Sequence, residues 1–358
     1  MLKASLSYYT GSIKTWQLEK KIVLDKSFFR TFNKNEKLCL LKAQEIFGAQ
    51  ADFVDGFKQK ESFVVLLKNS TFLGNTGVVV QNSKIIVESV LDIYRMAYSK
   101  VYRKPSFLKS KDKKGLYTSI IHLNYSNNFY HWNIDCLPRL FNIKRIPENE
   151  DINFIIREDM PEYQREVLSF FMEKDPRLKP VYISESEKWN IEKFWLPSFL
   201  TSSQSGFMPM ANIEYVRDTV LEGYDIKEGE GKRPIYISRK SARKRKLLNE
   251  DKIEELLEEL GVKIIQMEDL SFKQQLHEVN QADIIISPHG AGLSNILYAK
   301  DVKVIEIHPS NYVQTHYCML SNACDHDYFC YIGEEMDSDK NYQINIEKFE
   351  KFITGIIQ

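Results

Sequence analysis

Short apolar runs alternate with segments of helical periodicity from about residue 116 onward, and this alternation constrains the fold more than any other feature of the chain. A run such as Ile284–Ile286, with no polar break, is typical of a strand buried on both faces of a sheet. Strands that alternate with helices pair in parallel, because each crossover helix returns the chain to the same end of the sheet. The sequence therefore predicts an α/β fold class built on doubly wound, parallel sheets.

Length and composition indicate how this α/β chain divides. With 358 residues the chain is long for one core, so two main domains are expected. A stretch rich in glycine and charge at 222–233 suits a linker. Upstream, the sequence predicts a hairpin over Gly77–Val87 and an exposed basic loop over Arg103–Lys114. We predict four parts: 1–115, an irregular extension containing the β-hairpin; 116–225 and 226–343, two Rossmann-like domains; and 344–358, a closing helix.

Charge, hydropathy and cysteine usage exclude several classes of protein. Lysine plus arginine and aspartate plus glutamate both total 49, so no nucleic-acid partner is expected. No run of about 18 apolar residues occurs, and Met1–Thr10 lacks the apolar core of a secretion signal, so we expect neither a membrane span nor secretion. The five cysteines form no CxxC pair and leave one over, as is usual for free thiols in a reducing compartment. Cys318, Cys324 and Cys330 recur every sixth residue, which matches no common zinc spacing, so they are expected to be ordinary buried thiols.

The sharpest motif is a glycine-rich turn at Ser287–Asn295, between a buried strand and a predicted helix. Ligands of open α/β sheets bind at the carboxyl ends of the strands, and glycines there let backbone amides at a helix N-terminus approach a phosphate closely. The turn therefore suits a diphosphate, although Gly290 and Gly292 are equally explained by a tight strand-to-helix connection alone. It is not a GxGxxG motif, so no dinucleotide is predicted.

Charged residues lie near the same end of the neighbouring predicted strands. Glu306 ends the next strand, where a carboxylate can bond ribose hydroxyls; a solvated acid at a strand end is the alternative. Arg239, with Arg243 and Arg245 in the loop after it, can neutralise a diphosphate, because guanidinium groups match phosphate oxygens. A basic solvent-exposed loop explains the same residues without a ligand.

A second polar cluster lies in the N-terminal half, within Asn127–Arg139. On a helix His131 and Asp135 share one face, as a general base and its orienting carboxylate would, and either can take the proton from an attacking hydroxyl. A core or capped histidine is the alternative. Two Asp-x-Asp triplets, at 325–327 and 337–339, lie away from the glycine-rich turn in sequence, and no metal site is predicted there.

Taken in order, these motifs resemble the glycosyltransferase family 61 group, which includes bacterial capsular-polysaccharide members. The similarity covers roughly residues 74–332. The segments that carry it are His131-Trp132 through Leu137-Pro138-Arg139, Tyr236-Ile237-Ser238-Arg239, Asn249-Glu250, Leu270-Ser271-Phe272 with Gln275, Pro288-His289-Gly290-Ala291-Gly292-Leu293 with Asn295, and Val304-Ile305-Glu306. One departure is Gln274, where relatives often carry an acid, and this puts in doubt any role for that helix in positioning the donor.

The resemblance implies a GT-B architecture of two facing Rossmann-like domains, with an acceptor domain at 116–225 and a nucleotide-sugar donor domain at 226–343. It also implies inversion at the anomeric carbon and no bound metal. By this analogy the glycine-rich turn holds the diphosphate, Glu306 binds the ribose, and Arg239 stabilises charge on the leaving nucleotide. The positions expected in catalysis are His131, Asp135 and Arg239, and those expected in donor binding are Arg239, Arg243, His289, Gly290, Ala291, Gly292, Leu293, Asn295 and Glu306.

Family members use UDP-linked xylose, N-acetylglucosamine or related sugars, so the resemblance implies transfer from a UDP-sugar that is bound as substrate, with no further cofactor. The expected acceptor is an oligosaccharide or lipid-linked glycan of a bacterial capsule or lipopolysaccharide, in the cytoplasm or at the inner face of the membrane, with other capsule enzymes as partners. Two alternatives stay open: a polysaccharide pyruvyltransferase-like enzyme that shares the fold but not the nucleotide, and a non-catalytic capsule assembly factor. The sequence does not determine the donor sugar, the linkage or the oligomeric state.

Overall fold

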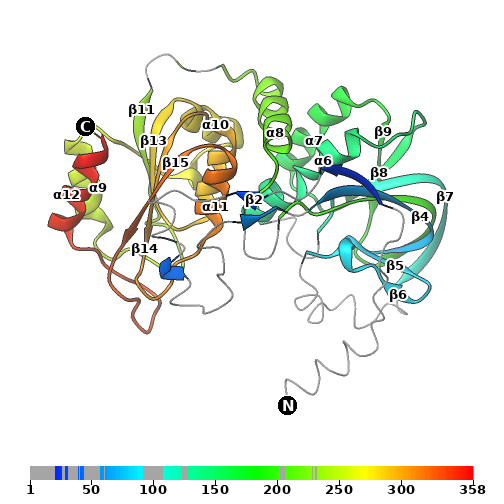
Figure 1. The fold of residues 1–358 in the computed structure, drawn as a ribbon, viewed down its shortest axis with the longest axis horizontal. Coiled ribbons are helices and arrows are strands. Elements are labelled where there is room, and N and C mark those ends of the chain that lie inside the picture. The colour runs from blue at the N-terminus through cyan, green and yellow to red at the C-terminus, as the bar shows by residue number, and fades with distance from the viewer. Residues whose placement is uncertain are drawn as a thin grey trace. The chain divides into compact units, whose positions relative to one another are not determined.

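A computed structural model of the chain forms two compact units (Figure 1). It describes residues 21–25, 29–30, 39, 41–43, 57–59, 61–91, 108–122, 128–201, 206–227, 229 and 232–357. Unit 1 takes its described residues from 1–28, 60–203 and 214–219, and unit 2 from 29–59, 204–213 and 220–358. Among the described helices, none is both long enough and apolar enough to cross a bilayer. The four-part division at residues 115, 225 and 343 stays a prediction.

Unit 2 is built on a five-stranded sheet in which every neighbouring pair is parallel, as the sequence predicts. In chain order its strands are β11 (Arg233–Ile237), β12 (Lys263–Ile265), β13 (Ala282–Pro288), β14 (Lys303–His308) and β15 (Asp327–Ile332). Their spatial order is β12-β11-β13-β14-β15, so the chain moves outward from β11 in one direction and then returns to build in the other. The reversal leaves a topological switch point between β11 and β13.

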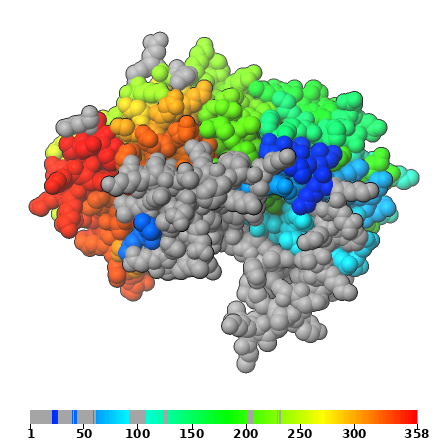
Figure 2. Space-filling model, in the orientation of Figure 1, coloured from blue at the N-terminus to red at the C-terminus, as the bar shows by residue number. Residues whose placement is uncertain are grey.

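Helices cover both faces of this sheet. They are α9 (Glu250–Glu259), α10 (Phe272–Asn280), α11 (His316–Ala323) and α12 (Ile346–Ile357), with 3-10 turns η5 (Met267–Asp269) and η6 (Ala291–Tyr298). Figure 1 shows α9 and α12 on one face and α10 and α11 on the other. The α9 and α12 side buries a core that includes Ile253, Phe349 and the strand residue Ile286. The outer side of α12 lies on the molecular surface, where Figure 2 shows it in red.

Two helix starts in unit 2 illustrate how local sequence sets the elements. Ser271 caps α10 through a capping box in which its hydroxyl accepts the amide of Gln274 and the Gln274 side chain accepts the amide of Ser271. Asn249 precedes α9, where an asparagine can cap a helix, but its side chain makes no cap bond. It instead donates to the carbonyl of Ile344 at 2.7 Å and accepts from that residue's amide at 3.2 Å, so it ties α9 to the segment before α12.

Unit 1 contains a mixed eight-stranded sheet, which differs from the purely parallel sheet expected. Its strands are β1 (Ile22–Asp25), β4 (Ser62–Leu73), β5 (Val78–Gln81), β6 (Lys84–Ile85), β7 (Lys109–Ser119), β8 (Ile152–Arg157), β9 (Leu178–Ile183) and β10 (Glu187–Pro197). The strands β10, β7, β8 and β9 pair in parallel, whereas β4 joins β10 antiparallel and continues into β5 and β6. The separate N-terminal hairpin extension is therefore not confirmed, because β5 and β6 belong to this sheet, with β6 at its edge.

The basic segment Arg103–Lys114 corrects one expectation. Its residues 109–114 belong to β7, not to a loop, while 103–107 lie outside the described residues. Both faces of this part of β7 are exposed, so neither alternation nor apolar content marked it as a strand. Backbone pairing with β10 holds it instead. A strand without a buried face carries little sequence signal.

Helices of unit 1 are short near the chain's polar cluster and longer elsewhere. They are α5 (Phe129–His131), the π-helical turn η4 (Trp132–Cys136), α6 (Arg139–Lys144) and α7 (Glu162–Lys174), with a 3-10 turn η2 (Val87–Ser89). A further helix, α8 (Met210–Gly223), divides its residues between the two units. The core of unit 1 includes Phe72, Ile155 and Phe194 from three different strands. The remaining described strands, β2 (Phe29–Arg30) and β3 (Phe57–Lys58), pair with each other and belong to unit 2.

Gly77 provides a test of the sheet of unit 1. Its φ is +76°, and a Cβ there would lie 2.0 Å from the carbonyl oxygen of Ile121. We expect Gly77→Ala to lower the free energy of unfolding by about 3 kcal/mol or more, because backbone strain and a clash with backbone add together. Gly115→Ala is the matched control: its φ is +94°, but its Cβ would meet nothing closer than 3.9 Å. It should lose only about 1 kcal/mol in urea unfolding, and equal losses would contradict the proposed contact.

Candidate functional site

The glycine-rich turn and Arg239 follow neighbouring strands at the switch point of unit 2. Arg239 comes two residues after β11, and the turn begins directly after Pro288, the last residue of β13. The hydroxyl of Ser287 donates to the carbonyl of Ile237 at 3.0 Å, which fixes the two strand ends to each other. Ligands of open α/β sheets bind outside the carboxyl ends of the strands at such a point. The topology therefore supports the place that the sequence indicated.

Position 290 must be a glycine because the side chain of Arg239 fills the space beside its Cα atom. Its φ of −176° is extended backbone that any residue adopts, so conformational freedom is not the reason for glycine. A Cβ at this position would lie 1.5 Å from Nη1 of Arg239, so the guanidinium group occupies the space that a side chain would need. Gly292 is also tightly packed, because its Cβ would lie 3.1 Å from Ile237. The glycine at position 290 thus lets the Arg239 guanidinium pack directly against the backbone of the turn.

The start of η6 adds hydrogen-bond donors beside this arginine. The amide of Leu293 makes the first helical hydrogen bond, 3.1 Å to the carbonyl of Gly290. The amides before it in the turn, those of Ala291 and Gly292, are the ones that a helix leaves without an intrahelical partner. Such amides, together with the positive end of the helix dipole, attract anions. Arginine and amides therefore converge on one position suited to a phosphate.

Two of the residues expected to bind the donor lie beneath the turn. The side chain of Leu293 is fully buried in the core. Asn295 is also fully buried, and its Nδ2 donates to the carbonyl of Gly292 and to Oε1 of Gln275, both at 3.1 Å. Gln275 in turn donates to the carbonyl of Met267 at 2.8 Å. These side chains hold the shape of the turn. Helix α10 thereby supports the turn through Gln275, and Gln274 serves the helix cap.

Glu306 is fully buried, and its carboxylate is occupied by protein groups. Oε1 lies 2.5 Å from Nδ1 of His289, and Oε2 accepts from the hydroxyl of Tyr328 at 2.7 Å and lies 3.3 Å from Nε2 of His308. Burial alone would favour the neutral acid, but the charge of His308 and these hydrogen bonds hold the pKa of Glu306 far below its usual range. The carboxylate therefore orients histidines, which differs from the ribose contact that the resemblance implied.

His289 is the turn residue whose side chain is best placed to meet a ligand. Only 13% of its side chain is exposed, and burial lowers its pKa even though Glu306 favours the charged form. Because the Glu306 carboxylate is ionised, Nδ1 of a neutral His289 carries the proton and Nε2 is left as an acceptor. The ring stacks on His308 with centroids 5.3 Å apart and lies 5.4 Å from Tyr317.

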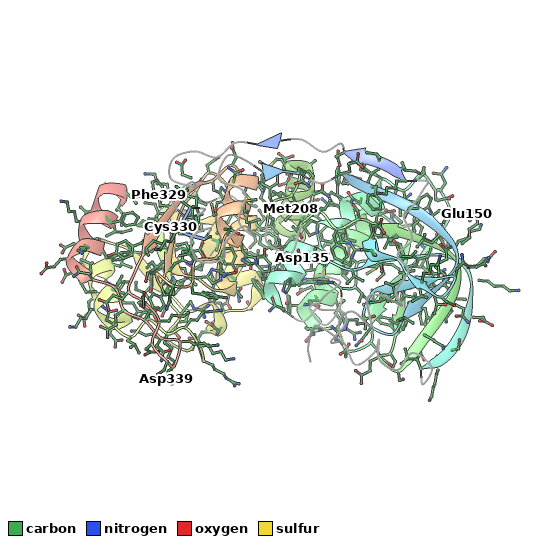
Figure 3. The ribbon with its side chains drawn as sticks, turned by 60° about the horizontal axis from the view of Figure 1, so that its bottom comes forward. Asp135, Glu150, Met208, Phe329, Cys330 and Asp339 are labelled. Carbon is green, nitrogen blue, oxygen red and sulfur yellow. The ribbon has the colours of Figure 1, made fainter. Side chains whose placement is uncertain are left out.

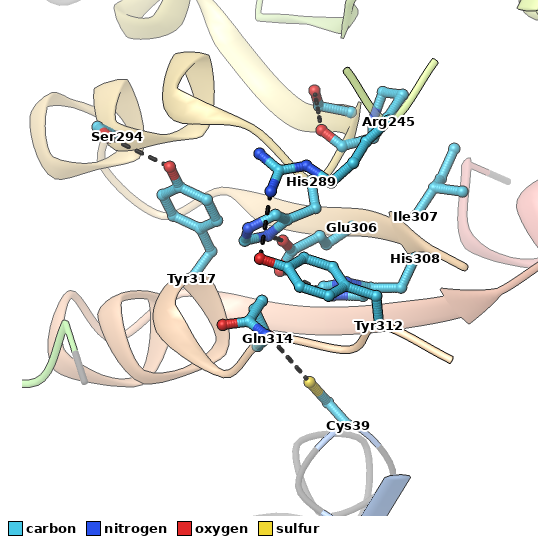
Figure 4. A network of polar contacts seen from close by, with 12 residues as sticks. Cys39, Arg245, His289, Ser294, Glu306, Ile307, His308, Tyr312, Gln314 and Tyr317 are labelled. Carbon is cyan, nitrogen blue, oxygen red and sulfur yellow. Dashed lines mark hydrogen bonds and ion pairs between the residues drawn. The ribbon is translucent and has the colours of Figure 1, made fainter. Parts of the chain in front are cut away.

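The second basic residue at this site is Arg245. Its Nη1 donates to the hydroxyl of Tyr312 at 3.2 Å, and its guanidinium lies 5.2 Å from the centre of that ring. Figure 4 shows Arg245 and Tyr312 beside His289. Arg243, which the sequence analysis placed in the donor site, is exposed. Of the two loop arginines, Arg245 is therefore the one that the structure brings to the turn.

Glu250 supports the loop after β11 and was not recognised as a site residue from sequence. It is buried at the start of α9, where its Oε1 accepts from the amide of Arg239 at 2.7 Å and from the hydroxyl of Tyr236 at 2.9 Å. Burial raises its pKa above the usual value. Its signal in the sequence was its place in Asn249-Glu250, one of the segments that carry the family resemblance, to which no role had been assigned.

The polar cluster of unit 1 forms a second candidate site. His131 ends α5, and Asp135 lies one turn later in η4, a π-helical turn of a kind often found at functional sites. Nδ1 of His131 and Oδ2 of Asp135 are 2.5 Å apart, while Oδ1 of Asp135 accepts the hydroxyl of Thr201. Asp135 is buried, whereas 18% of the His131 side chain is exposed. The structure thus pairs the two residues as the spacing predicted, with the imidazole as the more accessible group.

Arg139, which ends the same sequence segment, has a structural role. Its guanidinium is buried and donates to the carbonyls of Ile120 at 3.2 Å and Pro197 at 2.8 Å. It also stacks over the ring of Phe199 at 4.1 Å. Burial lowers the pKa of Arg139 to about 10, against the opposing effects of Cys136 and Asp135. The guanidinium therefore links the ends of β7 and β10.

Three clusters among the described residues have the composition of a metal site. Two of them coincide with the groups above: His122 with His131 and Asp135, and His289 with Glu306 and His308. The third, Cys39 with His308 and Cys330, shares His308 with the second. Of the two Asp-x-Asp triplets, the one at 337–339 forms a turn in which Oδ1 of Asp337 accepts two backbone amides, and Asp339 lies at the edge of unit 2 (Figure 3).

Part of the chain is similar to a known protein family. Residues 129–305 match the family model described as Glycosyltransferase 61, a span that contains His131, Asp135, Arg239 and the glycine-rich turn. Over these residues the chain is therefore similar to the glycosyltransferases of family 61.

A curated plant protein is also similar to part of the chain. It is Beta-1,2-xylosyltransferase RCN11 of Oryza sativa subsp. japonica, with 27% identity over 138 residues. The match covers 34% of this chain, and the chain spans a quarter of the length of that relative.

The contact between Gly290 and Arg239 leads to a specific prediction. We expect Gly290→Ala to displace the guanidinium group, because the new methyl group would occupy its position, while the fold tolerates the movement of a flexible side chain end. Turnover should fall by about 10²-fold, the usual cost of losing one electrostatic contact in an active site, with the melting temperature nearly unchanged. Gly355→Ala is the control, since its Cβ would meet nothing within 4 Å. Undiminished turnover of Gly290→Ala would exclude a role for this contact.

Proposed function

We propose that the chain is an inverting glycosyltransferase that takes a sugar from a nucleotide-diphosphate donor, most simply a UDP-sugar, and transfers it to a hydroxyl of a glycan acceptor. One observation carries the proposal: the guanidinium of Arg239 rests on Gly290 beside the amides that begin η6, at the switch point of a parallel sheet. Positive charge and backbone donors converge there on one anion-sized position. The family 61 match and the xylosyltransferase relative support the same class of reaction.

In this proposal unit 2 binds the donor and stabilises its departure. Arg239, Arg245 and the amides of Ala291 and Gly292 hold the diphosphate, which gains negative charge as the bond from the anomeric carbon breaks. Preorganised charge of this kind takes the place of a divalent cation, so the transfer step needs no metal. Nε2 of His289 accepts a hydrogen bond from a donor hydroxyl, so the ribose contact expected of Glu306 passes to the histidine that Glu306 orients.

Unit 1 supplies the base in the same proposal. The acceptor oxygen attacks the anomeric carbon from the face opposite the diphosphate, and its proton passes to Nε2 of His131. Asp135 accepts a hydrogen bond from Nδ1 and so fixes the tautomer that leaves Nε2 unprotonated. Between the two candidates, His131 is preferred because both oxygens of Asp135 already have protein partners and that residue is buried.

The biological setting is proposed on narrower grounds. We place the reaction in the synthesis of a capsule or lipopolysaccharide, on an oligosaccharide or lipid-linked acceptor at the cytoplasmic face of the membrane, together with other enzymes of that process. All five cysteines are free and buried, which suits a reducing compartment. The similarity to a xylosyltransferase makes a pentose donor the first to test.

Nucleotide binding tests the donor half of the proposal. Calorimetry with UDP, GDP, CMP and their sugar conjugates should detect one saturable ligand whose affinity is the same with and without EDTA. Arg239→Ala should lower turnover by about 10²- to 10³-fold, and Arg245→Ala should weaken nucleotide binding, because each removes a cation from the diphosphate position. Arg243→Ala is the matched control, since that side chain is exposed. Manganese-dependent binding, or equal effects of all three variants, would contradict the proposed site.

Kinetics of the unit 1 variants test the base. His131→Ala should lower kcat by about 10²- to 10⁴-fold, because the acceptor hydroxyl loses its proton acceptor, while calorimetry still detects the same nucleotide affinity. Asp135→Asn should also lower kcat, because an amide no longer fixes the tautomer of His131. The exposed histidine of α10 gives a control, and His277→Ala should leave kcat unchanged. A His131→Ala enzyme with normal kcat would assign the proton transfer elsewhere.

A further inference from the structure

Thiols and an imidazole gather in unit 2 in a cluster that the proposed reaction does not use. Sγ of Cys39, Sγ of Cys330 and a ring nitrogen of His308 lie within 4.8 Å of one another. Cys39 and His308 are fully buried, and Cys330 is 5% exposed. The three residues come from separate parts of the chain: His308 ends β14, Cys330 lies on β15, and Cys39 belongs to an N-terminal segment of unit 2 (Figures 3 and 4).

A fourth residue, Cys318, belongs to the same cluster. It lies on α11 and is fully buried. Side-chain hydrogen bonds join the Cys39 thiol to Cys318 and to Cys330. Three sulfur atoms therefore meet around Cys39, and the thiolate is the form in which cysteine binds a metal. Cys324, also buried, is not a member of the cluster.

The two nitrogens of His308 have different surroundings. Nε2 lies 3.3 Å from the Glu306 carboxylate, which also accepts a hydrogen bond from Tyr328. Nδ1 is buried and has no hydrogen-bond partner among the described residues. Histidines that bind a metal through one nitrogen typically donate the other N–H to a carboxylate, which fixes the tautomer and the ring orientation. Glu306 occupies the position of such a carboxylate, and the His308 ring is also hydrogen-bonded to the Cys39 thiol.

We propose that Cys39, Cys318, Cys330 and His308 form a structural zinc site. Three thiolates and one imidazole are a common closed, tetrahedral ligand set for Zn²⁺, and such a set leaves no open position for chemistry. The cation balances thiolate charge that would otherwise be buried at high cost. It also ties the segment that contains Cys39 to the strands β14 and β15.

This proposal revises the expectation that Cys318 and Cys330 are ordinary thiols. Motif spacing did not detect the site, because its first ligand lies 279 positions before Cys318 and the other ligands are distributed over a helix and two strands. The site also lies next to the donor turn, since Glu306 contacts both His308 and His289. It is nevertheless separate from catalysis, because the proposed transfer step uses none of its four ligands.

Metal analysis of the full-length protein, purified without a metal-affinity step, tests the proposal. We expect about one equivalent of zinc per chain by mass spectrometry. After exchange with Co²⁺, the protein should show the intense visible bands of a tetrahedral site and thiolate-to-cobalt charge transfer whose strength corresponds to three thiolates. This spectrum needs no variant, so it does not depend on the folding of altered proteins. Absence of zinc together with absence of a tetrahedral cobalt spectrum would overturn the proposal.

Variants then assign the ligands. Cys39→Ser, Cys318→Ser and Cys330→Ser should each reduce the zinc content severalfold and lower the cobalt charge-transfer intensity. Cys324→Ser is the matched control, a buried cysteine of the same unit that lies outside the cluster, and it should keep the full zinc content. Full retention of zinc by the Cys39 and Cys330 variants, or its loss in Cys324→Ser, would refute the ligand assignment. Because the readout is metal content, the result is independent of whether the protein transfers a sugar.

Discussion

A buried carboxylate is the constraint on which the rest of unit 2 depends. Glu306 carries its charge in the interior, and that charge is tolerable only because His289, His308 and Tyr328 surround it with donors. Each of these partners thereby becomes fixed. His289 is held in place within the glycine-rich turn, and His308 lies beside Cys39 and Cys330. One acid in the sheet therefore sets the geometry of two neighbouring groups with different chemistry, which is why its substitution cannot be interpreted as the loss of a single contact.

The parallel sheet makes this arrangement possible, because it places strand ends side by side although they are distant in sequence. The turn after β13, the loop after β11 and the end of β14 meet at one edge. Supports beneath that edge are equally specific. Asn295 donates to the carbonyl of Gly292 in the turn and to the side chain of Gln275, and Glu250 accepts from the backbone amide of Arg239. The surface that meets a ligand is thus formed largely by backbone and arginine, with most of the other polar side chains used to keep it rigid.

Sequence reasoning succeeded where a feature depends on local pattern. It predicted the alternation of strands and helices that gives unit 2 its parallel sheet, although not α11 or β15. It also predicted the pairing of His131 with Asp135, because periodicity and an i, i+4 spacing are contained in nearby residues. It failed where tertiary pairing decides. The charged residues 109–114 form a strand only because β10 lies beside them. The buried state of Glu306, the place of Arg245 over Tyr312 and the approach of Cys39 to Cys330 depend on contacts between distant segments, which no window of sequence contains.

The approach of Arg239 to Gly290 has a consequence for how this protein can change over evolutionary time. Because the guanidinium fills the volume of a missing methyl group, the two positions cannot vary independently. A larger residue at 290 becomes acceptable only after 239 has become shorter, and a shorter 239 removes the charge that makes the turn useful. A variant changed at only one of the two positions is therefore less fit than a chain with both residues kept or both replaced. The pair is therefore trapped by epistasis, and a family of such chains should keep both residues or lose both together.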